Sequence, residues 1–222
     1  MGLLGTVSHT LTGLARRLLR DNRMMVRGYF EHIYRNQDPY RTITDPEGEQ
    51  KRDDIIAAIA GRRFECALEI GSGEGTLALR LADHVDDLLL VDISERALRR
   101  ARQRLAHRPN VRMARLDFIA DPMPGTFDLV VCQEALVYAR PEDLGALSDK
   151  IISAVNDGGT LLLLHPRSIH DDDAGLEYKD IGAKTVHQFF IDDARTRVDL
   201  DKTYDMYRIT RMRKHVARAK RV

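Results

Sequence analysis

An alternation of strand-like and helix-like segments through the middle of the chain constrains its fold more than any other feature. Apolar runs typical of buried strands occupy 66–70, 88–92 and 111–116. Amphipathic segments typical of helices, 76–83 and 95–107, lie between them. Strands that are separated by helices pair in parallel, because a parallel pair needs a crossover connection.

The same alternation continues toward the C-terminus. Strand-like runs at 127–132 and 160–164 flank a helical segment at 143–155, and a Gly158-Gly159 turn precedes the fifth strand. Crossover helices cover both faces of such a sheet. The pattern therefore predicts an α/β fold with a doubly wound, mostly parallel sheet.

The N-terminal part differs from this core. Apolar residues recur at helical spacing over 10–34, which predicts one or two amphipathic helices with arginines between the apolar positions. A polar stretch containing Pro39 and Pro46 indicates a loop, and 53–60 indicates a short helix. We therefore expect residues 1–50 to form a helical cap or lid.

The C-terminal part completes the predicted sheet. A helix is expected at 183–190, followed by strand-like runs at 196–200 and 206–212 that would form an antiparallel edge hairpin. This gives seven strands in a domain covering 51–213. Residues 214–222 are expected to be a basic tail.

Composition limits the classes of partner. The chain has 35 Lys and Arg against 34 Asp and Glu, so net charge gives no general attraction to nucleic acid. Arginines interrupt the apolar positions near the N-terminus, and no apolar run approaches the ~20 residues that span a bilayer. Its two cysteines are too few for a disulfide framework. We expect a cytoplasmic protein that binds neither membrane nor nucleic acid.

Residues 69–75 (EIGSGEG) predict a ligand site. The glycines follow a strand and precede a helix, so the backbone there turns tightly and approaches a ligand closely. Asp92 ends the next strand, from which a carboxylate in a doubly wound fold reaches both hydroxyls of a ribose.

The spacing argues against the common phosphate ligands. A dinucleotide fingerprint needs glycine at position 76, which is threonine, and no P-loop sequence occurs. Glu69 would repel a pyrophosphate but could hold an ammonium group. S-adenosylmethionine has both a ribose and an ammonium group, and it has no phosphate.

Residues 69–75 and Asp92 resemble motifs I and II of class I S-adenosylmethionine-dependent methyltransferases. The resemblance extends to residues 117–118, 127–131 (FDLVV) and 156–161 (NDGGTL). It implies that Asp117 and Phe118 contact the adenine. The full set of residues expected at the cofactor is Glu69, Gly71, Ser72, Gly73, Gly75, Asp92, Ile93, Asp117, Phe118, Gln133, Tyr29 and Tyr34.

Within this class the chain is similar to the nodulation protein S family, whose members N-methylate an amino sugar. The similarity lies in the aromatic N-terminal segment, residues 133–138 (QEALVY) and a histidine after strand five. Pro166 and Arg167 follow that histidine, where family members usually have an aromatic residue. The amino-sugar substrate therefore does not carry over directly.

Ligands of open α/β sheets gather at the switch point beyond the strand ends, here between strands one and four. His165 closes strand five and is the predicted general base, since an unperturbed imidazole titrates near pH ~6.5. A hydrogen-bonded structural histidine is the alternative. Glu134 would hold an acceptor ammonium or hydroxyl, or cap the following helix.

We expect a small-molecule N- or O-methyltransferase, acting on an amino sugar, a glycoside or another secondary metabolite. RNA methylation along basic terminal segments and a catalytically silent methyltransferase-fold subunit are the alternatives. A homodimer and a monomer both remain open. No metal is expected, because the successive carboxylates at 171–173 point in divergent directions.

Overall fold

The computed structural model describes residues 23–40, 43, 45–167 and 181–216. Seven strands form one sheet in the order β3-β2-β1-β4-β5-β7-β6. Their bounds are β1 Phe64–Ile70, β2 Val85–Asp92, β3 Val111–Arg115, β4 Phe127–Gln133, β5 Val155–Pro166, β6 Thr196–Thr203 and β7 Tyr207–Lys214. The first five strands pair in parallel, and β7 pairs antiparallel with both β5 and β6. The predicted doubly wound sheet with an antiparallel C-terminal hairpin is confirmed.

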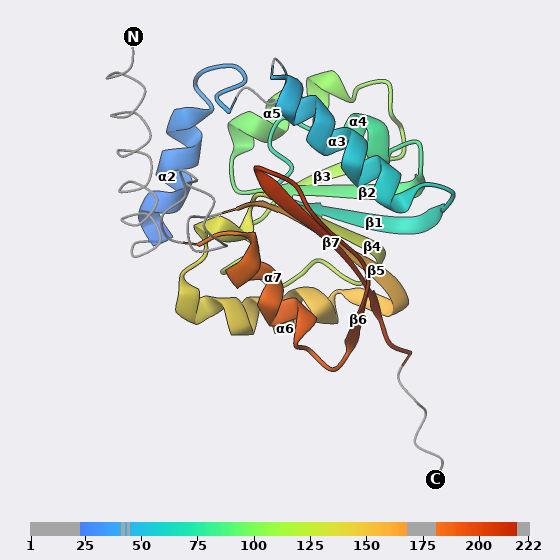
Figure 1. The fold of residues 1–222 in the computed structure, drawn as a ribbon. Helices are drawn as coiled ribbons and strands as arrows, with labels where there is room; N and C mark the ends of the chain where they lie inside the picture. Colours follow the sequence, from blue (N-terminus) through green and yellow to red (C-terminus); the bar gives the residue numbers. More distant parts are fainter. Residues whose placement is uncertain (1–22, 41–42, 44, 168–180, 217–222) are drawn as a thin grey trace.

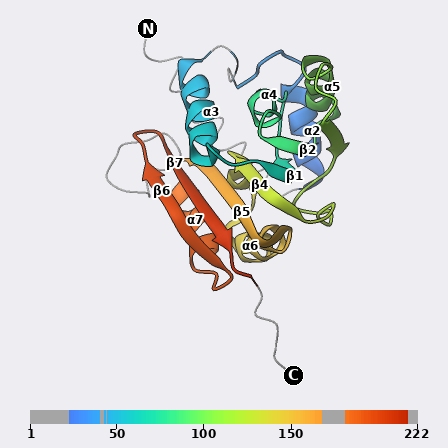
Figure 2. The ribbon, with the colours of Figure 1, turned by 90° about the vertical axis from the view of Figure 1, so that its right-hand side faces the viewer.

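Helices cover both faces of this sheet. The α-helices are α2 Arg23–Ile33, α3 Pro46–Ile59, α4 Ala78–Leu81, α5 Glu95–Arg104, α6 Leu144–Ser153 and α7 Ala183–Ile191. Figure 1 shows α3, α4 and α5 on one face and α6 and α7 on the other, and Figure 2 shows the same layers turned by 90°. Two apolar clusters, one on each face, make up the core. No helix in the described part of the chain combines the length and apolar character needed to span a membrane.

The alternating strand pattern explains the two clusters. Along β1, Leu68 and Ile70 pack toward α6 and α7, whereas Ala67 packs toward α3 and α4. Neighbouring strands pair in register, with Leu68 opposite Leu89 and opposite Val130. Since successive side chains of a strand point to opposite faces, an uninterrupted apolar run fits a sheet that is covered on both sides.

The helix α3 begins earlier than predicted. Pro46 lies in its first turn rather than in a loop, and the side chain of Asp45 accepts a hydrogen bond from the Glu47 amide at 3.0 Å. An acidic N-cap followed by proline is a favourable helix start, because proline needs no amide partner there. The expected boundary at residue 50 therefore falls inside one helix, and α3 joins the predicted cap to the sheet.

Two other local predictions were inaccurate. The helix expected at 76–83 is the four-residue α4, and the Gly158-Gly159 turn lies within β5 rather than before it. The pairing of β4 with β5 shifts between Phe127 and Leu129, which marks a bulge. Gly158 adopts a φ of 76° there, a conformation that suits glycine. The first half of the helical segment expected at 10–34 lies outside the described residues.

Candidate functional site

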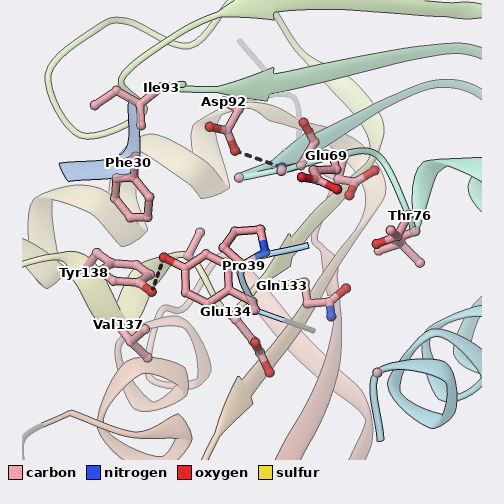
Figure 3. A pocket seen from close by; sticks show the side chains of 18 of the residues that line it. Phe30, Pro39, Glu69, Thr76, Asp92, Ile93, Gln133, Glu134, Val137 and Tyr138 are labelled. Carbon is pink, nitrogen blue, oxygen red and sulfur yellow. Dashed lines mark hydrogen bonds between the residues drawn. The ribbon is translucent and has the colours of Figure 1, made fainter. Parts of the chain in front are cut away.

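One pocket of about 400 Å³ opens at the carboxyl ends of the parallel strands. Its lining comes from the ends of β1, β2, β4 and β5 and from the segments that precede β1. Figure 3 shows Asp92 and Glu69 on one side of it and Glu134 and Tyr138 on another. We refer to the part formed by Glu69, residues 71–73, Asp92 and Asp117 as the glycine-loop end. The part formed by Phe30, Tyr40, Lys51, Glu134 and Tyr138 is the β4 end.

Glu69 is a buried carboxylate without a full set of partners. Its side chain is 3% exposed, and among the described residues its Oε2 has no hydrogen-bond partner. Burial, together with the negative charge of the nearby Asp92 carboxylate, raises its pKa to about 8. The Oγ of Ser72 is likewise buried with no partner among these residues. Such atoms are costly unless a ligand satisfies them, and a cationic donor would do so.

Asp92 has a structural role as well as a place in the pocket lining. Its oxygens accept hydrogen bonds from the amides of Gly73 and Ser94, each at 2.8 Å. Burial raises the pKa of Asp92 to about 6, and these amides act in the opposite direction. Each carboxylate oxygen accepts more than one hydrogen bond, so Asp92 retains capacity for ligand hydroxyls. It therefore fixes the glycine loop and faces the pocket at once.

The remaining residues predicted at the glycine-loop end also line the pocket. Asp117 accepts hydrogen bonds from the amides of Ile119 and Ala120 at 3.0 and 3.3 Å, which fixes the loop after β3. Phe118 is partly buried against the α6–α7 core, and it lines the pocket together with Asp117. The structure also places Ile93 and Gln133 in the lining.

The glycines of the loop have different roles. A Cβ at Gly73 would lie 2.9 Å from the hydroxyl of Tyr34, so only glycine allows Tyr34 to close over the loop. A Cβ at Gly75 would lie 2.9 Å from Cδ1 of Leu105, and Gly75 is not part of the pocket lining. The prediction that Gly75 binds the ligand is corrected: it lets the loop pack against α5.

Ion pairs fasten the cap to α5. The carboxylate of Glu31 accepts from the Glu95 amide at 2.7 Å and lies 3.3 Å from Nε of Arg96. Arg100 pairs with Glu74 and also donates to the carbonyl of Asn36 at 2.6 Å. A carboxylate at a helix N-terminus is stabilising because unpaired amides point toward it. The helix α2 is thereby held beside the strand ends, where Figure 1 shows it.

Only part of the predicted aromatic lid reaches the pocket. Tyr34 is 7% exposed and lines it, whereas Tyr29 does not and instead packs edge-on against Phe30, with ring centroids 5.4 Å apart. The Phe30 ring lies edge-on to Tyr138 at 4.9 Å. The hydroxyl of Tyr138 donates to that of Tyr40 at 3.4 Å. Phe30 and Tyr40, rather than Tyr29, are therefore the cap's aromatic contributions to the β4 end.

Glu134 lies directly after β4 in an unusual conformation. Its backbone φ is 54°, a value that residues other than glycine rarely adopt. Its Oε1 lies 2.6 Å from Nζ of Lys51, and the same Nζ lies 2.8 Å from Oε1 of Glu47. Burial alone would lower the pKa of Lys51, but Glu134 and Glu47 outweigh it and hold that pKa above its usual value. Strained backbone of this kind is concentrated at functional sites.

The prediction of His165 as a general base at the rim is corrected. His165 is 0% exposed and is absent from the pocket lining. The Leu136 amide donates to its Nε2 at 3.3 Å, and its Nδ1 lies 3.0 Å from Nε2 of His187. Nδ1 of His187 lies 2.7 Å from the Thr210 hydroxyl. These bonds assign each ring as a neutral Nδ1–H tautomer that donates to the next group.

Burial lowers the pKa of His165 to about 3 and holds that of His187 well below its usual value. Neither ring therefore takes up a proton near neutral pH. The alternative interpretation, a hydrogen-bonded structural histidine, describes His165 in this structure.

Three residues of the β4 end were missed by the sequence analysis: Phe30, Tyr40 and Lys51. The helical spacing that placed Tyr29 and Tyr34 on one segment also includes Phe30, so that signal was present. No such signal marks Lys51 in the sequence, because its contact with Glu134 joins residues 83 positions apart. Among the described residues no group of three His, Cys, Asp or Glu could hold a metal ion, and the carboxylates at 171–173 lie outside them.

Comparison with known proteins agrees with this geometry. Residues 67–159 match a methyltransferase domain family. An uncharacterized methyltransferase of Mycobacterium tuberculosis is 34% identical over 113 residues, which cover 50% of this chain and 56% of that protein. Nodulation protein S of Azorhizobium caulinodans is 27% identical over 136 residues, 60% of this chain and 64% of that protein. The matched region thus spans little more than half of each relative.

Solved structures extend the likeness in fold. N-methyltransferase NodS of Bradyrhizobium japonicum, in complex with S-adenosyl-L-homocysteine, superimposes with a TM-score of 0.73 at 22% identity. The match covers 84% of this chain and 97% of that one. The strand order, the glycine loop and the match to the domain family all indicate a methyltransferase fold. Over residues 67–159 the chain thus matches a methyltransferase domain family, and its fold is that of class I S-adenosylmethionine-dependent methyltransferases such as nodulation protein S.

Proposed function

We propose that the protein transfers the methyl group of S-adenosylmethionine to a nitrogen or oxygen atom of a small molecule. The observation that carries this proposal is the buried Glu69 carboxylate, whose Oε2 lacks a partner among the described residues, in the same pocket as Asp92. The two carboxylates match the ammonium group and the ribose hydroxyls of that cofactor.

The glycine-loop end fits the cofactor residue by residue. Glu69 would hold the ammonium group, and Asp92 would accept from the ribose hydroxyls. Asp117 would accept from the adenine amine, with Phe118 packed on the ring. The bound cofactor supplies a methyl group already activated on a sulfonium. The chain's task is to align the acceptor with that methyl and to exclude water, which the cap residues Phe30 and Tyr34 favour.

The charge of the pocket favours an amine as the acceptor. The described lining includes one lysine, Lys51, and seven acidic residues: Asp45, Glu47, Glu69, Glu74, Asp92, Asp117 and Glu134. Burial keeps Glu69 largely protonated and Glu74 pairs with Arg100, so the excess negative charge lies with the other five. This balance attracts a protonated amine and disfavours phosphate. A protonated amine must lose a proton before its nitrogen can attack the methyl group. Glu134, at the β4 end, is the proposed carboxylate that holds the acceptor and takes its proton.

Methyl transfer to matched acceptors tests the proposal. The protein is incubated with S-adenosylmethionine and pairs that differ only in the acceptor atom, such as glucosamine with glucose and benzylamine with benzyl alcohol. Mass spectrometry should find one added methyl group on an amine, with the paired alcohol methylated far more slowly. Methylation of a short RNA instead would favour the alternative enzyme. Cofactor binding without turnover across a broad acceptor panel would favour a silent subunit.

A further inference from the structure

At the β4 end, two carboxylates share a single lysine. Glu47 and Glu134 carry two negative charges, and Lys51 between them carries one positive charge. The formal net charge of this cluster beside the pocket is therefore about −1. The side chain of Lys51 is 13% exposed, whereas those of Glu134 and Glu47 are 34% and 42% exposed, so solvent screens the carboxylates more than the lysine.

Lys51 contacts residues of three different elements. Its Nζ lies 2.6 Å from Glu134, the residue at the end of β4, and 2.8 Å from Glu47, one turn earlier on α3. It also lies 5.5 Å above the ring of Tyr207 from β7. A lysine held by one helix and one aromatic ring can release Glu134 without losing all its stabilising contacts.

Glu134 is directed toward the pocket by its backbone. The positive φ at this position places the carboxylate among the lining residues, and Figure 3 shows it below Tyr138 and Pro39. Among the described residues, Lys51 is the group that pairs with this carboxylate. A cation that enters the β4 end would therefore compete with Lys51 for Glu134.

We infer that Lys51 determines acceptor selectivity as a displaceable counter-ion: an acceptor ammonium takes its place on Glu134, and Glu47 retains the displaced lysine. This inference rests on the proposed function and specifies how its amine acceptor is recognised. A neutral hydroxyl acceptor has no positive charge with which to replace Lys51 beside Glu134. The exchange thus selects cations, and Lys51 limits how tightly they bind.

Two cofactor analogues test this without knowledge of the acceptor. Sinefungin carries an ammonium-bearing carbon where S-adenosylmethionine has its methylsulfonium, whereas S-adenosylhomocysteine has no charge there. The dissociation constant of S-adenosylhomocysteine divided by that of sinefungin measures how strongly the pocket attracts a cation at the methyl position. Calorimetry gives both constants for the full chain and for each variant.

Partner exchange predicts a characteristic pattern of ratios. The ratio should exceed one in the unaltered protein and fall at least about threefold in Glu134→Gln, which loses the carboxylate. It should rise at least about threefold in Lys51→Met, which loses the competitor. It should fall in Glu47→Gln, because Lys51 then has no second carboxylate to accept it. Lys202→Met, an exposed lysine on β6, is the matched control and should leave the ratio unchanged.

The other outcomes overturn the inference in distinguishable ways. A lower ratio in Lys51→Met would mean that Lys51 orients Glu134 rather than competing for it. Equal ratios in all variants, with S-adenosylhomocysteine still bound, would contradict the inference and leave the proposed function intact. If neither analogue binds the unaltered protein, the proposed function fails and the inference fails with it. Thermal unfolding of each variant confirms that the protein measured is folded.

Discussion

The two ends of the pocket are built in different ways. At the glycine-loop end, Glu69, Ser72 and Asp92 come from two adjacent strands and the loop between them, and backbone amides fix Asp92. At the β4 end, Lys51 and Glu134 come from segments 83 residues apart and are joined by side chains. The first end is fixed by the sheet itself, whereas the second depends on how the cap and α3 pack against it.

This difference implies a division of roles. Backbone amides hold their geometry in the absence of ligand, so the glycine-loop end is suited to one constant ligand. An ion pair of side chains can change partners, so the β4 end is suited to selecting among acceptors. Substitutions at the first end should change cofactor affinity, and substitutions at the second should change acceptor selection.

The largest effect on cofactor affinity is expected from Asp92→Ala. The substitution removes the charged acceptor for the ribose hydroxyls and leaves the Gly73 amide without its partner. It should cost about 1.5–3 kcal/mol of affinity for S-adenosylhomocysteine, a loss of roughly 10- to 160-fold. Calorimetry measures the dissociation constant. Asp87→Ala, which removes a half-buried carboxylate paired with Arg112 on the same strand, is the matched control. Equal affinity in both variants would place the ribose elsewhere.

A replacement of His165 should affect stability rather than turnover. In His165→Leu the Leu136 amide and Nε2 of His187 lose their partners within the core. Leaving such groups unpaired should lower the free energy of unfolding by about 2–4 kcal/mol. Turnover per folded molecule should stay within about twofold, because His165 lies outside the pocket lining. A loss of 10²-fold or more in a folded variant would restore His165 as a base.

The buried histidines also predict how stability depends on pH. Burial lowers the pKa of His165 to about 3 in the folded protein, from the usual value of 6.5. Between these values the unfolded chain binds more protons than the folded one. The contribution of His165 to the free energy of unfolding therefore falls as the pH falls from 6.5 toward 3. Denaturant unfolding at several pH values should show a shallower acid loss in His165→Leu than in the unaltered protein. Identical slopes would contradict the assignment.

Tyr138→Phe should have the smallest effect. It removes the hydroxyl that donates to Tyr40 but keeps the ring that packs against Phe30. At 3.4 Å between partly exposed hydroxyls, this hydrogen bond should contribute less than about 1 kcal/mol. Affinity for S-adenosylhomocysteine should stay unchanged, and the acceptor's Michaelis constant should rise less than about threefold. A large loss of cofactor affinity would show that the two ends are not independent.

Local sequence carries enough information to predict one end of the pocket. Glu69 lies next to the end of β1, Asp92 ends β2 and Asp117 follows β3. An apolar run predicts both a strand and the point where it ends. Because parallel strands end at the same edge of a sheet, these carboxylates were expected to lie together. The family resemblance added the adenine contacts of Asp117 and Phe118.

The errors arise where tertiary packing decides the orientation of a side chain. His165 does end a strand, but the ring packs toward α7, where His187 lies 22 positions later in sequence. Gly75 resembles the other loop glycines, yet its neighbours are Ala101 of α5 and Leu105 directly after that helix. Nothing local to either residue encodes those partners.

The most direct test of the account is a titration of the protein with S-adenosylhomocysteine at pH 7 in buffers of different ionisation enthalpy. The pKa of Glu69 is raised to about 8, so this carboxyl is mostly protonated before binding. An ammonium group beside it requires the ionised form, so micromolar binding should release nearly one proton per ligand. Glu69→Gln should bind more weakly and release none. Absence of binding, or binding with the same proton balance in both proteins, would contradict the account.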